Sequence, residues 1–462
     1  MSMSRRPSEQ QGEFWVPTAD LPQSPGHVFY DKLNGLLADA GFDRHVEELC
    51  RPFYADEVGR PSIAPGIYYR MLLVGYFEGI DSQRGIAWRC ADSLSLRSFL
   101  GVPLGESTPD HSSLTRIRDR LSFEIHEEVF VFVLKLAHER KLLRGKTVAV
   151  DATTLEANAA MRNIVRKESG EDYKAYLKRL LAEEGVENPT DEDARRFDRT
   201  RKKKTSNEEW ESASDPESQI TKMKDGRTHL GYKAEHAVDL DSGLLLSVEV
   251  LPATASDPST LADRLMDAEL KLKAAGSDQT VDEAVADKGY HKAETLSLLE
   301  DLETRTYIPE PQGRKYRRSD HPEEHRRAAK ANRRRMREDR GKRLQKRRSE
   351  LAERSFAHLC ETGGARRTWL RGKEKINKRY LVQAAGYNLN LLMRALFGVG
   401  KPRVLQGSDG VAGCCAAKLG DMRRWMASIA ARIGRGMKRW WAAAVGTLAW
   451  RLAPVSGFST GC

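Results

Sequence analysis

The sequence predicts a mixed α/β sheet with helices on both faces, preceded by an all-helical region. Three observations support this fold class. Apolar residues recur at helical spacing through residues 26–140. Beyond residue 145, short apolar runs and helix-like segments follow in the order strand, strand, strand, helix, strand, helix, strand, helix. The turn Asp241-Ser242-Gly243 joins two of these runs into a predicted hairpin.

The N-terminal part is predicted to be helical. Residues 1–25 are polar and contain proline, so we expect them to be mobile. Helices are expected at 65–79, at 82–91, after Pro109, and at 123–138, where apolar residues form a stripe. Short helices with tight turns fit a helix-turn-helix DNA reader and fit a plain helical bundle equally well.

The second part supplies the predicted sheet. A strand at 146–151 ends in an acid, and a polar, charged, helix-prone insert follows at about 157–224. The predicted strands are 230–239, 244–251, 281–286 and 306–309, and the predicted helices are 258–274, 293–302, one through residues 353 and 356, and 380–397.

Positive charge is concentrated in one segment. The chain of 462 residues has a net charge of +11, and residues 314–348 hold 17 Lys/Arg and 5 Asp/Glu, a net +12. The net charge of the rest of the chain is therefore −1. Such a block binds phosphate backbones by releasing counterions, although a solvated helix or linker has the same composition. Residues 398–462 are a basic tail with interleaved tryptophans, which fits a contact with DNA or with a membrane surface, or an ill-ordered extension.

Several protein classes are disfavoured. No apolar run reaches the ~20 residues of a membrane span, and we see no signal peptide. The six cysteines are scattered and form no CxxC pair, which argues against a disulfide framework or a zinc ribbon. We therefore expect a cytoplasmic protein without a membrane partner.

Three carboxylates carry the chemical hypothesis. Asp151 and Asp287 each follow an apolar strand, and Glu353 lies on a predicted helix. An aspartate after a strand often only caps a turn. Two of them in this fold order, beside a basic block, favour a site where carboxylates bind two divalent cations and DNA phosphodiester bonds are cut.

The chain resembles bacterial insertion-sequence transposases of the DDE type, whose catalytic domain is RNase H-like. The resemblance covers about residues 30–397 and includes a similar helical N-terminal domain at 61–121. Its motifs here are VAVDATTLEAN (148–158), GYKAEHAVD (231–239), ADKGY (286–290), Glu353, Arg371-Gly372 and AGYNL (385–389).

This resemblance implies Asp151, Asp287 and Glu353 as catalytic and metal-binding residues, with two Mg²⁺ ions, or Mn²⁺, as cofactors. One metal would activate water or a 3′-hydroxyl, and the other would stabilise the leaving oxygen. The family's Tyr, Arg and Lys companions of the glutamate are missing, because Lys346, Ser349 and Cys360 stand in their places. Glu350 is therefore an alternative third acid.

The resemblance also implies partners and boundaries. DNA contacts are expected from Lys288, His291, Arg347 and Arg348. Double-stranded DNA, as terminal inverted repeats and target, would be bound by a homodimer, in a bacterial, nucleoid-associated setting. The expected domains are 26–140 for DNA binding and 141–397 for catalysis. Cleavage with strand transfer is the predicted reaction; a nuclease without strand transfer and an inactive DNA-binding relative are the alternatives.

Overall fold

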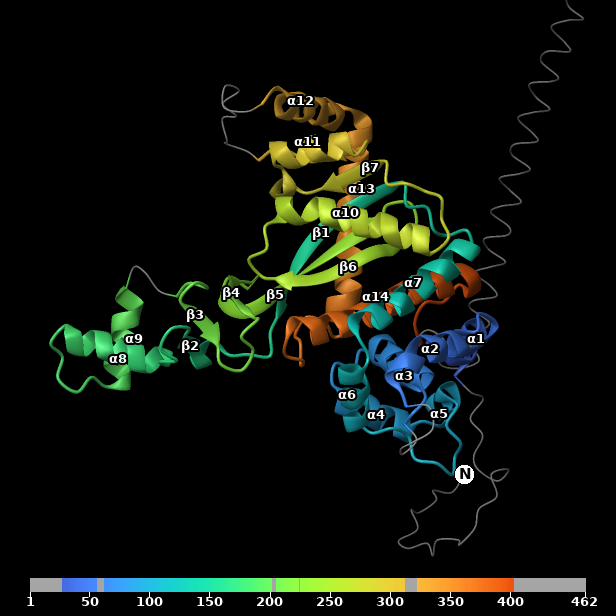
Figure 1. Ribbon diagram of the computed structural model, residues 1–462, viewed down its shortest axis with the longest axis horizontal. Coiled ribbons are helices and arrows are strands. Elements are labelled where there is room, and N and C mark those ends of the chain that lie inside the picture. The colour runs from blue at the N-terminus through green and yellow to red at the C-terminus, as the bar shows by residue number, and fades with distance from the viewer. Residues whose placement is uncertain (1–26, 56–61, 202–204, 224, 312–321, 403–462) are drawn as a thin grey trace, which may run out of the picture.

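The structure is a computed structural model that describes residues 27–55, 62–201, 205–223, 225–311 and 322–402. A helical region and a mixed sheet lie side by side, and a smaller arm projects from the sheet (Figure 1). The predicted mobile N-terminus and nearly all of the basic tail lie outside the described residues. None of the described helices is long and apolar enough to cross a membrane.

The N-terminal region is all-helical, as predicted. Its buried centre is α3, which is apolar on nearly all sides. The helices are α1 (Val28–Asp39), α2 (Phe42–Cys50), η2 (Arg51–Phe53), α3 (Pro65–Glu78), α4 (Gln83–Asp92), α5 (Leu94–Leu100), α6 (His111–Arg120) and α7 (Phe123–Glu139).

The sheet has six strands. Its order is β4-β5-β1-β7-β8, and β6 pairs with β5 beside β4. β1 is antiparallel to β5 and parallel to β7, so the sheet is mixed as predicted. The strands are β1 (Thr147–Glu156), β4 (Gln219–Lys222), β5 (Thr228–Asp239), β6 (Leu245–Pro252), β7 (Glu283–Ala286) and β8 (Arg305–Tyr307).

Helices cover both faces of this sheet. α10 (Asp257–Ala274) packs on β6, β1 and β5, whereas α13 (Asp339–Phe356) crosses the opposite face against β1, β7, β5 and β8 (Figure 1). Because both faces are covered, β1 begins with a continuous apolar run, Val148 to Val150, that is fully buried. α11 (Ala293–Asp301) and α12 (Glu323–Arg337) stack beyond β8.

α14 (Lys373–Phe397) joins the two regions, because it packs against α7 and α3 on one side and β6 on the other. It begins seven residues before the predicted helix at 380. Gly386 is required here, since a Cβ at this position would lie 2.6 Å from the ring of Tyr76. The π-helical turn η6 (Ala357–Thr362) connects α13 towards this helix.

Asparagine side chains complete both edges of the sheet. Asn388 of α14 accepts from Leu245 N (2.9 Å) and donates to Leu245 O (2.8 Å). Asn377 likewise accepts from Val250 N and donates to Val250 O. Asn332 of α12 bonds the backbone after β8. The edges are thus closed to further strand pairing, and Asn388 of the AGYNL motif has a structural role.

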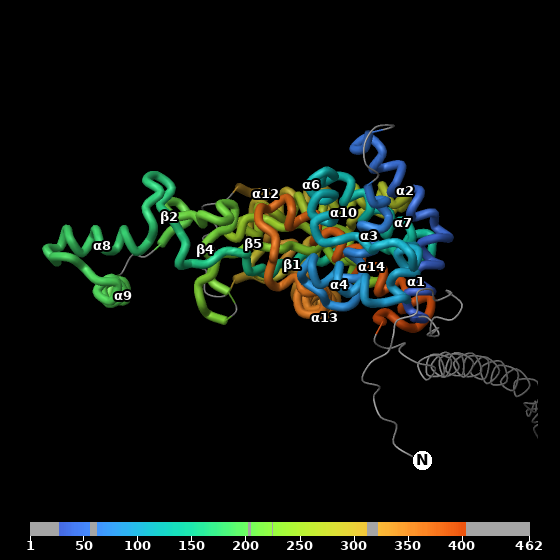
Figure 2. The backbone as a smooth tube through the Cα atoms, turned by 90° about the horizontal axis from the view of Figure 1, so that it is seen from below, coloured from blue at the N-terminus to red at the C-terminus, as the bar shows by residue number. Residues whose placement is uncertain are grey.

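The charged insert folds into an arm. It contains η3 (Met161–Asn163), β2 (Ile164–Arg166), α8 (Tyr173–Glu183), α9 (Asp191–Thr200) and β3 (Trp210–Ser212), and it extends away from the sheet (Figure 2). Helix was expected there, but the small β2–β3 sheet and the edge strand β4 were not. Their strands are only three or four residues long, too short for a visible alternation.

Candidate active site

Asp151 and Asp287 lie at neighbouring positions on two adjacent strands. Val150 of β1 pairs with Ala286 of β7 in parallel register, and each aspartate is the next residue. Asp287 then opens the short helix η4 (Lys288–Tyr290), where its Oδ1 accepts from Gly289 N at 2.6 Å. The structure therefore brings the two predicted strand-borne acids together.

Asp151 is mostly buried and is paired with a cation. Arg348 Nη1 of α13 lies 2.7 Å from Asp151 Oδ2, and Asp151 Oδ1 accepts from Ala152 N at 2.9 Å. Burial raises the pKa of the Asp151 carboxyl; Arg348 opposes this shift, and the carboxylates of Asp287 and Asp257 add to it.

One row of residues fixes α13 against the sheet. Gln345 Nε2 donates to Ala286 O (3.0 Å) and Tyr307 O (2.7 Å), and Arg348 follows one turn later. Two turns further, Ser355 Oγ lies 2.8 Å from Nδ1 of buried His236, which pairs with Asp151 across β1 and β5. Residues spaced by three and four lie on one helix face, so this face points to the acids.

Neither candidate third acid lies on that face. Glu353 is about 140° around the helix from Arg348 and is exposed, with no side-chain hydrogen bond or ion pair to any described residue. Glu350 is also exposed and pairs with Arg354. Within the described part of the chain, no three Asp, Glu, His or Cys side chains gather closely enough to hold a metal ion.

Asp257, at the start of α10, is an acid that the sequence analysis did not single out. Lys233 Nζ lies 2.6 Å from its Oδ1. A Cβ on Gly289 would lie 2.8 Å from Asp257 Oδ2 and 2.9 Å from Asp287 Oδ1, so these oxygens are at most 5.7 Å apart, the sum of the two distances. In the sequence, Ser256-Asp257-Pro258 looks like an ordinary helix start, so nothing there indicated that Asp257 lies near Asp287.

The four predicted DNA contacts lie in different surroundings. Arg348 touches Asp151, and Lys288 is exposed directly beside Asp287. Arg347 is exposed and donates to Asp241 O at 3.1 Å. His291 is half-buried, and burial lowers its pKa.

Residues 314–321 of the basic segment lie outside the described residues. In the described part, 322–348, some arginines hold helices to the sheet and other basic side chains are exposed. Arg340 pairs with buried Glu283, and Arg335 donates to Thr306 O at 2.9 Å, so these two arginines anchor α12 and α13 to the sheet. A separate groove, between the β5–β6 turn and α13, is lined by Asp241, Ser242, Arg343, Lys346, Arg347, Glu350, Leu351 and Arg354. Its basic side chains are exposed on the same helix that carries Arg348.

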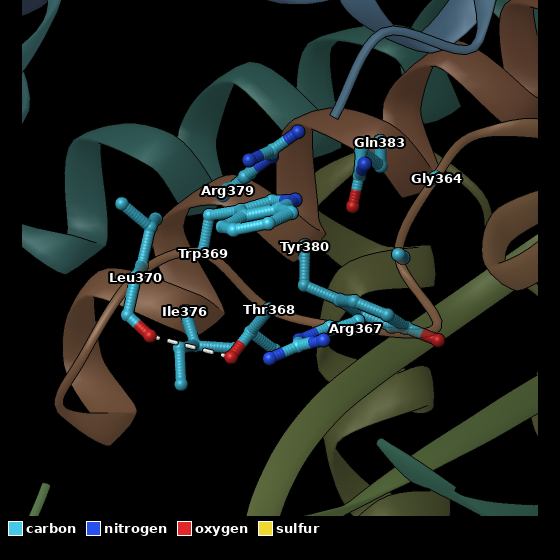
Figure 3. A pocket seen from close by; sticks show the side chains of 10 residues that line it. Gly364, Arg367, Thr368, Trp369, Leu370, Ile376, Arg379, Tyr380 and Gln383 are labelled. Carbon is cyan, nitrogen blue, oxygen red and sulfur yellow. Dashed lines mark hydrogen bonds between the residues drawn. The ribbon is translucent and has the colours of Figure 1, made fainter. Parts of the chain in front are cut away.

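A small pocket lies between residues 364–370 and the first half of α14 (Figure 3). Trp369 closes one side and donates from Nε1 to Asp81 Oδ2 of the helical region at 2.7 Å. Burial lowers the pKa of Arg379 in this pocket to about 10. The segment pairs with Glu156 at the far end of β1, so the pocket joins the two regions and is separate from the acids.

Two of the three family acids fit a divalent cation. Asp151 and Asp287 offer hard carboxylate oxygens from a rigid sheet, and the guanidinium on Asp151 shows that this oxygen accepts a cation. The third ligand is not assembled among the described residues.

Comparison with protein families agrees with this geometry. A family model described as Transposase domain (DUF772) matches residues 19–120, and one described as Transposase DDE domain matches residues 144–389, more than half of the chain. Neither a curated protein nor a solved structure matches. The sheet order with its flanking helices is the RNase H-like arrangement expected for this family. The chain belongs to the Transposase DDE domain family.

Proposed function

We propose that this transposase cleaves DNA at the ends of a mobile element and joins the freed ends to target DNA, with divalent cations, Mg²⁺ in the first place, as cofactor. The observation that carries this proposal is the adjacent register of Asp151 and Asp287 beside the basic helix α13. The DDE family match supports the same reaction class.

Each residue has a defined role in this proposal. Asp151 and Asp287 would hold the cations from neighbouring strand ends, and Glu353 would close the site. When bound, these cations supply an activated nucleophile and stabilise the leaving oxygen. Lys288 and Arg347, both exposed, and His291 are proposed to bind phosphate around the acids.

We also propose that the protein works on double-stranded DNA as a homodimer. Two terminal repeats must be held together for both ends to be joined to one target. The helical region and the basic groove on α13 are the proposed DNA-binding surfaces, because the groove has four basic side chains at its rim.

The test uses the full-length protein, Mg²⁺ and oligonucleotides that carry the ends of its own element. Asp151→Asn and Asp287→Asn should each lower cleavage by at least about 10²-fold, because each removes a charged metal ligand. DNA binding, measured by gel shift, should persist. Asp263→Asn on α10 is the matched control, since Asp263 is exposed and has no side-chain hydrogen bond or ion pair with a described residue.

The products also separate the alternatives. Joined element and target strands support a transposase, whereas cut strands without joining indicate a nuclease. Cleavage that survives either substitution, with the protein folded, contradicts the role of that aspartate. Wild-type protein that binds its ends and never cuts them indicates an inactive relative.

A further inference from the structure

The side chain of Arg348 occupies a position that the proposed chemistry needs for another purpose. Its guanidinium lies 2.7 Å from Asp151 Oδ2, and the two side chains are only 13% and 22% exposed. A divalent cation such as Mg²⁺ sits about 2.1 Å from its carboxylate ligands. Arg348 and a metal ion therefore compete for the same buried oxygen.

We propose that Arg348 is an exchangeable cation: it neutralises Asp151 while the site lacks metal, and metal binding releases it to bind a DNA phosphate. This inference rests on the proposed function, since it assumes that Asp151 is a metal ligand. It adds a coupling between metal binding and substrate binding that the roles of the acids alone do not contain.

Burial makes this exchange useful. The Asp151 side chain is only 22% exposed, so an unpaired charge on it is costly and the carboxylate needs a cation at every stage. Arg348 supplies one from within the chain. A divalent cation satisfies the carboxylate better, and the displaced guanidinium then loses Asp151 as its partner.

The released guanidinium stays on a helix that carries exposed basic side chains. Arg348 lies on α13 one residue after Arg347, whose side chain lines the exposed basic groove. A guanidinium binds phosphate with two parallel hydrogen bonds, a geometry that a lysine cannot provide. The same side chain can therefore serve Asp151 in one state and a phosphate in the other.

Gln345 holds the first state in place. Its Oε1 accepts from Arg348 Nε at 3.2 Å, while its Nε2 donates to Ala286 O and Tyr307 O. This links the position of Arg348 to the ends of β7 and β8, next to Asp287. Gln345 acts through Arg348 and is a positioning residue in this proposal.

The first experiment measures Mn²⁺ binding to the full-length protein by calorimetry, without DNA. Arg348→Gln should bind Mn²⁺ at least about five-fold more tightly than wild type, because the competing cation is gone. Lys342→Gln is the matched control, because it removes an exposed cation of α13 outside the basic groove, and it should leave the affinity unchanged. Gln345→Ala should shift the affinity in the same direction by less, and it serves as the second variant if Arg348→Gln does not fold.

The second experiment measures DNA affinity with and without Ca²⁺, which binds the same kind of oxygen ligands. Arg348→Gln should weaken DNA binding at least about five-fold with Ca²⁺ and little without it. An equal loss in both conditions overturns the exchange, as does unchanged or weaker Mn²⁺ binding by folded Arg348→Gln.

Failure of the underlying function gives a different result. Asp151→Asn should lose Mn²⁺ affinity if Asp151 is a ligand. If Asp151→Asn binds Mn²⁺ as wild type does, the proposed metal site is wrong, and the exchange falls with it. If Asp151→Asn loses binding while Arg348→Gln does not gain it, only the exchange is wrong.

Discussion

The strand-borne acids and the helix-borne acids of this protein differ in how their positions are fixed. Asp151 and Asp287 follow residues that pair with each other in the sheet, so their backbone positions are set by hydrogen bonds between β1 and β7. Glu350 and Glu353 lie in the last two turns of α13, before it continues into η6, where no local interaction decides which face meets the sheet.

That face is chosen by distant residues. His236 of β5 lies between Ser355 of α13 and Tyr380 of α14, and its ring stacks on Phe356 with centroids 4.0 Å apart. The distances from its ring nitrogens to the two hydroxyl groups are 2.8 and 2.7 Å. A helix-borne acid is thus directed by a buried histidine more than a hundred residues away in sequence.

The largest effect is expected from removing this anchor. His236→Ala should lower the free energy of unfolding by about 3 kcal/mol, because it leaves a cavity and two buried hydroxyl groups without their partner. Urea unfolding measures the loss. DNA cleavage by the folded variant should also weaken, since α13 carries Glu353, the proposed third acid; unchanged cleavage would show that the position of α13 does not depend on His236.

The next effect separates the two helix-borne acids. Glu353→Gln should lower DNA cleavage by about 10²-fold, because Glu353 has no partner among the described residues and remains available as a ligand. Glu350→Gln should lower it only a few-fold, since Arg354 already holds that carboxylate. The reverse order would assign the third acid to Glu350, and two small effects would break the triad hypothesis.

The same contrast explains how much of the molecule could be predicted from its sequence. The helical region, the succession of strands and helices along the chain, and the placement of Asp151 and Asp287 after strands followed from apolar periodicity and from the order of elements. The register that makes these two strands neighbours was not predicted. The contact between Arg348 and Asp151 was not predicted either, because it depends on the rotation of α13. The β2–β3 arm was missed because its strands are too short to show a period.

A smaller effect tests the buried histidine through pH. Burial lowers the pKa of His236 from 6.5 to about 3. Between pH 6.5 and pH 3 this histidine is protonated in the unfolded chain and neutral in the folded chain. The free energy of unfolding therefore falls as the pH falls below 6.5. From pH 7 to pH 5 the loss from this histidine should be about 2 kcal/mol. His236→Gln should show a shallower decline of its urea midpoint; parallel declines would contradict the buried, neutral state.

The smallest effect concerns Asp257, an acid that lies on a helix but whose position is fixed by a neighbouring strand. Asp257 is the first residue of α10, five residues after the end of β6, and Lys233 of β5 holds its Oδ1. Its other oxygen faces Asp287 across Gly289. Asp257→Asn should therefore lower Mn²⁺ affinity and DNA cleavage by about 10-fold each, the usual effect of a residue that supports metal ligands.

Asp263→Asn, two turns further along α10, is the control and should change neither quantity. Loss of thermal stability without a change in Mn²⁺ affinity would reduce Asp257 to a helix start held by Lys233. A loss of Mn²⁺ affinity without a loss of thermal stability would support a role for Asp257 beside Asp151 and Asp287. An acid on a helix would then be fixed by the sheet because it follows a strand closely in the chain. Acids on a helix that starts directly after a strand are then fixed by the sheet, whereas acids on α13 depend on remote anchors such as His236.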